Sequence, residues 1–156
     1  MKIIAVRSDF DLNLLKQVAE KHTFIDEDFD CGIEHYLKHL DKIYHNPLAI
    51  MLLALDEDKP VGYMIAYKDS SGLRNEGRSF DVFILPEYQN QGLLLEFIRH
   101  ITLWVLKMEI SKMIFSSRVL KKETFEKYVP VKVHDSEYKE YYVLRDEYLD
   151  YLNGGQ

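Results

Sequence analysis

The fold is decided by one stretch of the chain, Val82-Phe83-Ile84-Leu85-Pro86-Glu87-Tyr88-Gln89-Asn90-Gln91-Gly92-Leu93-Leu94. Its apolar first part, ended by Pro86, predicts a strand, and Gly92 stands where a long apolar helix begins. The first turn of a helix has unpaired N–H groups and the positive end of the helix dipole, so it can hold a phosphate group. Gly92 would let such a ligand approach the backbone, or it would simply ease the turn from strand to helix. The residue types alone leave both interpretations open.

The helix that follows has the strongest pattern in the chain. From Gly92 to Met108, apolar residues recur at helical spacing: Leu94, Phe97, Ile98, Ile101, Trp104, Val105 and Met108. The same reasoning predicts two earlier helices, at 10–22 and 32–44. Apolar and β-branched runs predict strands at 3–6, 48–55, 61–67, 80–85, 113–115, 131–133 and 138–144, and weaker patterns predict helical turns at 120–128 and 145–152.

This order of elements predicts an α/β fold. Read along the chain it is β-α-α-β-β-β-α-β-α-β-β, a mixed central sheet with helices on both faces. The 156 residues suit one domain, 1–156, with 145–156 as a C-terminal extension, because domains commonly have about 100–200 residues.

Composition narrows the function classes. The 20 Lys and Arg residues against 26 Asp and Glu residues give a net charge of −6, which argues against nucleic acid and fits a cationic partner. The lone cysteine, Cys31, excludes an internal disulfide framework and suggests a reducing compartment. We find no signal peptide and no apolar run long enough to span a membrane, so we expect a cytoplasmic protein.

The stretch around Gly92 resembles the acyl-CoA-binding motif of the GNAT acetyltransferase superfamily. That family has a strand ending in V-x-P, followed by Q/R-x-x-G-x-G/A at the start of a long helix. Here the corresponding residues are Ile84-Leu85-Pro86 and Gln89-Asn90-Gln91-Gly92-Leu93-Leu94. The resemblance covers nearly the whole chain, from a first strand followed by Arg7 to a last strand containing Tyr141-Tyr142-Val143-Leu144.

The resemblance implies an acetyl-CoA-dependent N-acetyltransferase with a primary amine as acceptor, on a small molecule, a lysine side chain or a protein N-terminus. The backbone of Phe83 and Ile84 would bind the pantetheine arm of the cosubstrate acetyl-CoA. The CoA pyrophosphate would be held by the amides of Gln89, Asn90, Gln91, Gly92, Leu93 and Leu94. A homodimer is the default expectation for a small symmetric assembly.

Three departures from the family pattern concern the approach of CoA and the catalytic step. Leu94 replaces the final Gly/Ala of the motif, and a bulky side chain there could narrow the approach of the pyrophosphate. Phe80 and Arg78 stand where the family often carries a base, and neither is one. Phe125 stands where the family has a tyrosine. The alternative interpretation is therefore a catalytically impaired GNAT-fold protein that serves as a binding or structural module.

Three residues remain as catalytic candidates. Tyr128, one helical turn beyond Phe125, is the candidate acid for the leaving thiolate, with packing as the alternative. His134, on the predicted final hairpin, is a candidate proton relay. Asp81 is adjacent to a position of the family base, but strand alternation points its side chain to the opposite face.

Other polar clusters have simpler explanations. Cys31, His35 and His39 share one helical face, but that face lies opposite the apolar stripe, so exposed surface residues are expected and no metal site. The acidic residues at 26–30 either attract a cationic amine or form a solvated loop, and we favour the loop. The remaining histidines, His22, His45 and His100, are interpreted as isolated side chains.

Overall fold

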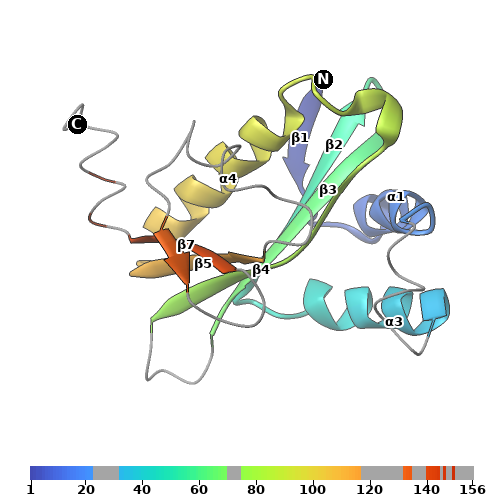
Figure 1. Cartoon of the computed structure of the whole chain (residues 1–156). Helices are drawn as coiled ribbons and strands as arrows, with labels where there is room; N and C mark the ends of the chain where they lie inside the picture. The colour runs from blue at the N-terminus through green and yellow to red at the C-terminus, as the bar shows by residue number, and fades with distance from the viewer. Residues whose placement is uncertain are drawn as a thin grey trace. The chain divides into compact units, whose positions relative to one another are not determined.

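A computed structural model of the chain describes residues 1–22, 32–69, 75–116, 132–134, 140–144, 146 and 149. The elements, labelled in Figure 1, are β1 (Lys2–Ala5), α1 (Asp9–Ala19), α3 (Gly32–Tyr44), β2 (Ala49–Asp56), β3 (Lys59–Lys68), β4 (Glu76–Ile84), the 3₁₀ helix η1 (Pro86–Tyr88), α4 (Leu93–Lys107), β5 (Lys112–Ser116), β6 (Lys132–His134) and β7 (Glu140–Leu144).

The described strands form one seven-stranded sheet with the order β1-β2-β3-β4-β5-β7-β6. Strand β1 runs antiparallel to β2, with Lys2 opposite Leu55. Strand β4 is parallel to β5 over Glu76–Arg78 and Lys112–Ile114. Strand β7 is antiparallel to both β5 and β6. The sheet is therefore mixed, as the order of elements predicts.

The chain divides into two compact units. The first contains Met1–Ile65 and Val82–Phe97, and the second contains Ala66–Asp81 and Ile98–Gln156. Because the boundaries fall inside β3, β4 and α4, each unit is made of segments distant in sequence.

The first unit buries an apolar core between helices and strands. Helix α1 begins at Ser8, whose side chain accepts a hydrogen bond from the Asp11 N–H and so caps the helix. Strand β2 is buried on both faces from Met51 to Leu55, as its continuous apolar run predicts. The buried side chains of the two helices are Leu12, Leu15, Val18, Ala19, Tyr36 and Leu40.

The second unit is organised around β5 and most of α4. Met113, Ile114 and Phe115 of β5 are all buried. Helix α4 contributes Ile98, Ile101, Trp104 and Val105, the apolar stripe that its periodicity predicts. The Lys68 ammonium donates to the carbonyl of Met108 just beyond the helix, at 3.0 Å, which satisfies an end carbonyl of α4.

Several boundaries differ from the sequence-based predictions. Helix α1 ends at Ala19 rather than His22, and the last residues close in tight turns from Lys21 N–H to Val18 O and from His22 N–H to Ala19 O. Strand β4 begins at Glu76, four residues early, because pairing with β5 extends it through polar residues. At the start of α4 the buried leucine is Leu93, whereas Leu94 is half-buried.

The predicted final hairpin is confirmed by β6 and β7. The predicted turns at 120–128 lie outside the described residues, as does most of 145–152. Among the residues described, no helix is both long and apolar enough to cross a membrane.

Strand β3 approaches the end of β4 closely at Gly62. A Cβ at Gly62 would lie 3.0 Å from the Phe83 carbonyl oxygen and 3.3 Å from the Ile84 Cα, and backbone atoms cannot rotate away. We therefore expect Gly62→Ala to lower the free energy of unfolding by about 1–3 kcal/mol, measured by urea denaturation.

Gly77→Ala is the matched control. Its Cβ would meet only side-chain atoms, Met113 Sδ at 2.8 Å and Ile110 Cδ1 at 3.1 Å, and these side chains can change rotamer. The loss should be smaller than at Gly62, and an equal or larger loss would contradict the backbone explanation.

Candidate functional site

The candidate site begins where β4 turns into η1. The Leu85 N–H donates to the Val61 carbonyl at 2.9 Å and extends the contact with β3 past the end of β4. Pro86 then begins η1, where its fixed φ and missing N–H are tolerated. The Tyr88 N–H donates to Leu85 O and the Gln89 N–H to Pro86 O, so the chain reverses direction within four residues.

The loop from Gln89 to Gly92 contains two residues in the left-handed region. Asn90 has φ 61° and Gly92 has φ 84°. Asparagine and glycine are the residue types that adopt this conformation at least cost. Two left-handed residues flanking Gln91 turn the chain just before α4 begins at Leu93.

The first turn of α4 has amides without intrahelical acceptors. Within the described loop and helix, the first helical bond runs from the Glu96 N–H to the Gly92 carbonyl at 3.2 Å. The N–H groups of Gly92, Leu93, Leu94 and Leu95 therefore precede the i to i−4 hydrogen bonds of the helix and have no acceptor within that series. A Cβ placed on Gly92 would meet nothing within 4 Å, so the space above this backbone is open. Together these features fit a diphosphate.

Two glutamine side chains hold the loop from within. Gln89 Nε2 donates to the Ile84 carbonyl at 3.0 Å, and Gln91 Nε2 donates to the Glu87 carbonyl at 2.9 Å. Both side chains therefore hold the backbone before α4 in place. The Ile84 carbonyl, one of the groups expected to face the pantetheine arm, keeps a second lone pair for another donor.

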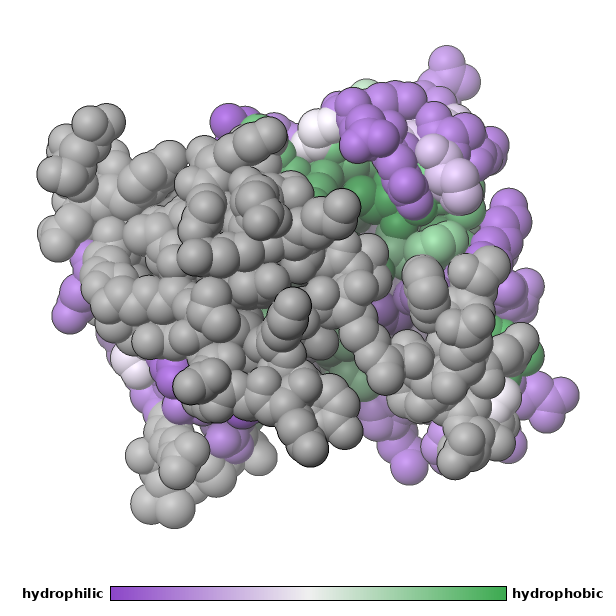
Figure 2. Space-filling view, viewed as in Figure 1, coloured by the Kyte–Doolittle hydropathy of each residue, from purple (hydrophilic) through white to green (hydrophobic). Residues whose placement is uncertain are grey.

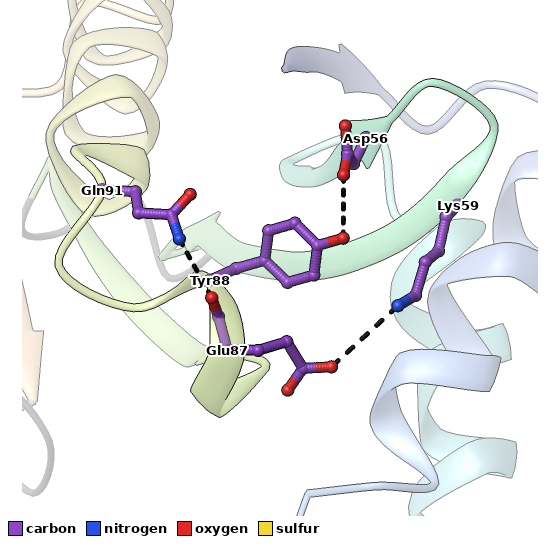
Figure 3. Close-up of polar contacts among 5 residues, drawn as sticks. All are labelled: Asp56, Lys59, Glu87, Tyr88 and Gln91. Carbon is purple, nitrogen blue, oxygen red and sulfur yellow. Dashed lines mark hydrogen bonds and ion pairs between the residues drawn. The ribbon is translucent and has the colours of Figure 1, made fainter.

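A polar brace connects η1 to the turn between β2 and β3 (Figure 3). The Tyr88 hydroxyl donates to Asp56 Oδ2 at 2.8 Å. The Lys59 ammonium lies 5.3 Å from the centre of the Tyr88 ring and 4.0 Å from Glu87 Oε1. The hydrogen bond to Asp56, with smaller contributions from burial and from the charges of Asp56 and Glu87, raises the pKa of Tyr88 above 10.0. Tyr88 is therefore a neutral donor at physiological pH.

The surface around the loop is hydrophilic. Figure 2 shows hydrophilic residues gathered where the β2–β3 turn and the loop before α4 lie. The exposed polar residues of these two segments are Glu57, Asp58, Lys59, Glu87, Gln89, Asn90 and Gln91. Several of them are acidic, so an anionic ligand would depend mainly on backbone amides and the helix dipole here.

A second feature of the first unit is an aromatic cluster, defined as His22, Tyr36, Tyr63 and Phe83, in which Phe83 is half-buried and the other three side chains are buried. The His22 ring stacks on the Phe83 ring, with centroids 4.5 Å apart and an interplanar angle of 14°. Tyr63 lies tilted beside both rings, 6.4 Å from each centroid. The hydroxyls of Tyr63 and Tyr36 are hydrogen-bonded at 3.0 Å.

The interpretation of His22 as an isolated side chain is therefore wrong. Its exposed fraction is 7%, because it continues the apolar face of α1 three and four residues beyond Ala19 and Val18. That spacing was the signal in the sequence. The loop-like composition of the residues after His22 hid it.

Of the three predicted catalytic residues, the structure describes Asp81 and His134. Asp81 has a half-buried side chain on β4 and belongs to the second unit. His134 lies in β6, where its backbone is paired with Glu140. Tyr128 and Phe125 are outside the described residues.

Of the three residues expected on one exposed face of α3, the structure describes His35 and His39. His35 is exposed, but His39 is partly buried, which differs from the expectation of a fully exposed face. Burial and, to a lesser extent, the nearby Lys42 and His35 lower the pKa of His39. Cys31 lies outside the described residues, and among those described no three His, Cys, Asp or Glu side chains are grouped to hold a metal.

Comparison with known proteins shows the family to which the chain belongs. The sequence model of the acetyltransferase (GNAT) family matches residues 14–121. Since this is well over half of the chain, the chain belongs to the acetyltransferase (GNAT) family. Among curated protein sequences, none matches it.

Solved structures share the fold at low sequence identity. PaiA N-acetyltransferase from Thermoplasma acidophilum, in complex with coenzyme A, is 17% identical with a TM-score of 0.67, over 92% of this chain and 99% of that chain. A variant of spermidine N-acetyltransferase SpeG from Vibrio cholerae is 14% identical with a TM-score of 0.67, over 97% and 99%. Tetrahymena GCN5 is 12% identical with a TM-score of 0.66, over 97% and 100%.

The hydrogen bond between Tyr88 and Asp56 leads to a prediction about the alkaline titration of the Tyr88 phenol. Because the pKa of Tyr88 is raised in the folded state, its bond to Asp56 is fully present below pH 10 and is lost as the pH rises through the folded-state pKa. The difference in phenolate absorbance between the wild type and Tyr88→Phe should show one phenol that ionises above pH 10. Asp56→Asn, which keeps an acceptor but removes the charge, should lower that pKa. An unchanged titration in Asp56→Asn would contradict the assignment.

Proposed function

We propose that this protein is an acetyl-CoA-dependent N-acetyltransferase that acts on a primary amine. The observation that carries the proposal is the left-handed loop at Asn90 and Gly92, which presents the first amides of α4 to open space. A diphosphate fits such a backbone arrangement, because the amides donate to its oxygens and the helix dipole favours its charge. Family membership supports the same chemistry.

In this proposal, the residues of the first unit bind the cosubstrate. The amides from Asn90 to Leu94 hold the diphosphate, while the Gln89 amide already donates to Pro86. The backbone of Phe83 and Ile84 binds the pantetheine arm. Leu94 is compatible with this role, since its N–H belongs to the open first turn even though its side chain is bulky.

The acceptor is proposed to be a cationic amine. The net charge of −6 favours the approach of a cation. Two of the similar structures are a spermidine N-acetyltransferase and an aminoglycoside 6'-acetyltransferase. The cytoplasmic location and the homodimer expected from the sequence are part of the same proposal, as are the roles of Tyr128, His134 and Asp81 in proton transfer.

A second candidate function is a GNAT-fold module that binds acyl-CoA without turnover. Phe80 and Arg78 favour it, because neither side chain can act as a base where the family often has one. An amine that loses its proton to another group would still react, so these two positions alone do not remove activity.

Turnover separates the two functions. The purified protein is mixed with acetyl-CoA and a panel of amines that includes a polyamine, an aminoglycoside and a lysine peptide, and release of free CoA thiol is recorded. We expect release above background with at least one amine. Binding of acetyl-CoA in calorimetry without any release would instead support the binding module.

Gly92 provides the sharpest test of cosubstrate binding. Gly92→Asp places a carboxylate beside the proposed diphosphate and should weaken acetyl-CoA binding by roughly 100-fold or more. Gly92→Asn has the same shape without the charge, and both residues tolerate a positive φ, so it should bind much more tightly than Gly92→Asp. Calorimetric titration measures both. Equal binding by the two variants would place the diphosphate elsewhere.

A further inference from the structure

We propose that His22 takes the proton from the acceptor amine, and that Tyr63 and Tyr36 hold its imidazole in position. This inference rests on the proposed function and supplies the base that Phe80 and Arg78 cannot provide. Its structural basis is the aromatic cluster of the first unit, in which a buried imidazole lies against the β4 residue Phe83.

The position of Phe83 places the imidazole next to the cosubstrate. The His22 and Phe83 rings are stacked at 4.5 Å, and the backbone of Phe83 is one of the two proposed contacts of the pantetheine arm. The imidazole is therefore one side chain away from the arm that carries the thioester. An amine that attacks the thioester must come to the same end of β4.

The exposed fraction of the side chain differs among the residues of the aromatic cluster. Tyr63 and Tyr36 are 0% and 1% exposed, whereas His22 is 7% exposed. The two tyrosines belong to the core, and the imidazole lies at its edge. Phe83 beside it is half-buried, so a proton would enter and leave the cluster on the side of His22 and Phe83.

The neighbours of the imidazole fix its orientation. Tyr63 of β3 faces it at 6.4 Å between centroids, and the Tyr63 hydroxyl is hydrogen-bonded to that of Tyr36 on α3. Tyr63 is a titratable neighbour of His22, Tyr36 is joined to the cluster through Tyr63, and β4 contributes Phe83, which does not titrate. Glu20 and Lys21, the two residues before His22 in the chain, are exposed. Tyr63 and Tyr36 are thus positioning residues.

In the proposed step, the acceptor ammonium loses two protons and gains the acetyl group. The ammonium form of the acceptor gives one proton to the neutral imidazole, and the free amine forms the bond to the acetyl carbon. The carbon–sulfur bond breaks, and the CoA thiolate takes the second proton from the amine nitrogen. The imidazolium then releases its proton to solvent. Acetyl-CoA and the amine are the only reactants.

Two substitutions at His22 separate proton transfer from packing. Phe keeps an aromatic ring to stack on Phe83, and Gln keeps polar groups, but neither is a base. We expect both His22→Phe and His22→Gln to lower kcat/KM for an alkyl amine by about 100-fold at neutral pH. If His22 only packs, His22→Phe should keep its activity.

A weakly basic acceptor provides the second measurement. Methoxyamine is already neutral at the assay pH, so it needs no proton acceptor before attack. The loss in the His22 variants should then be only a few-fold with methoxyamine. An equal loss with both acceptors would overturn the proposal, because a structural defect does not depend on the acceptor's protonation.

Control measurements distinguish failure of this inference from failure of the proposed function. The His22 variants should bind acetyl-CoA as the wild type does in calorimetry, and thermal unfolding confirms that they fold. A wild type that turns over no amine would overturn both proposals. Turnover by the wild type with unchanged His22 variants would overturn the role of His22 alone.

Discussion

The structure of the candidate site depends on one constraint, the reversal of the backbone between Gln89 and Leu93. Within this stretch Asn90 and Gly92 take positive φ, a conformation that asparagine and glycine adopt at least cost. The consequence is electrostatic as well as geometric. The reversal leaves the first amides of α4 in front of an open space, with the positive end of the helix dipole behind them.

The rest of the first unit keeps that reversal in place. Gln91 and Gln89 fold back onto the carbonyls of Glu87 and Ile84, and Tyr88 anchors η1 to the β2–β3 turn through Asp56. Each of these bonds is partly exposed and contributes little energy alone. Their effect is to remove alternative conformations of the loop, so that a ligand meets amides that are already oriented.

The sequence predicted those parts of the fold that depend on local pattern. Helix α4 and the buried strand β2 follow from periodicity and from a long apolar run, because burial on known faces dictates both. The early start of β4 did not follow, since Glu76 and Arg78 join the strand only through pairing with β5. His22 was missed for a different reason: its spacing after Val18 and Ala19 was a local signal of burial, but the loop-like residues that follow hid it, and its partner Phe83 is distant in sequence.

The two halves of the proposed chemistry differ in how sequence encodes them. In the proposed function, phosphate binding by the loop requires a backbone conformation, which two residue types with positive φ and a following helix can supply, so it does not depend on the side chain of Leu94. Proton transfer requires a particular side chain at a particular place, and several elements of the first unit can bring one there. The absence of a base at Phe80 and Arg78 is therefore compatible with the proposed base at His22, just beyond the end of α1. Backbone geometry constrains where the thioester lies, and the side chains around that point decide which residue takes the proton.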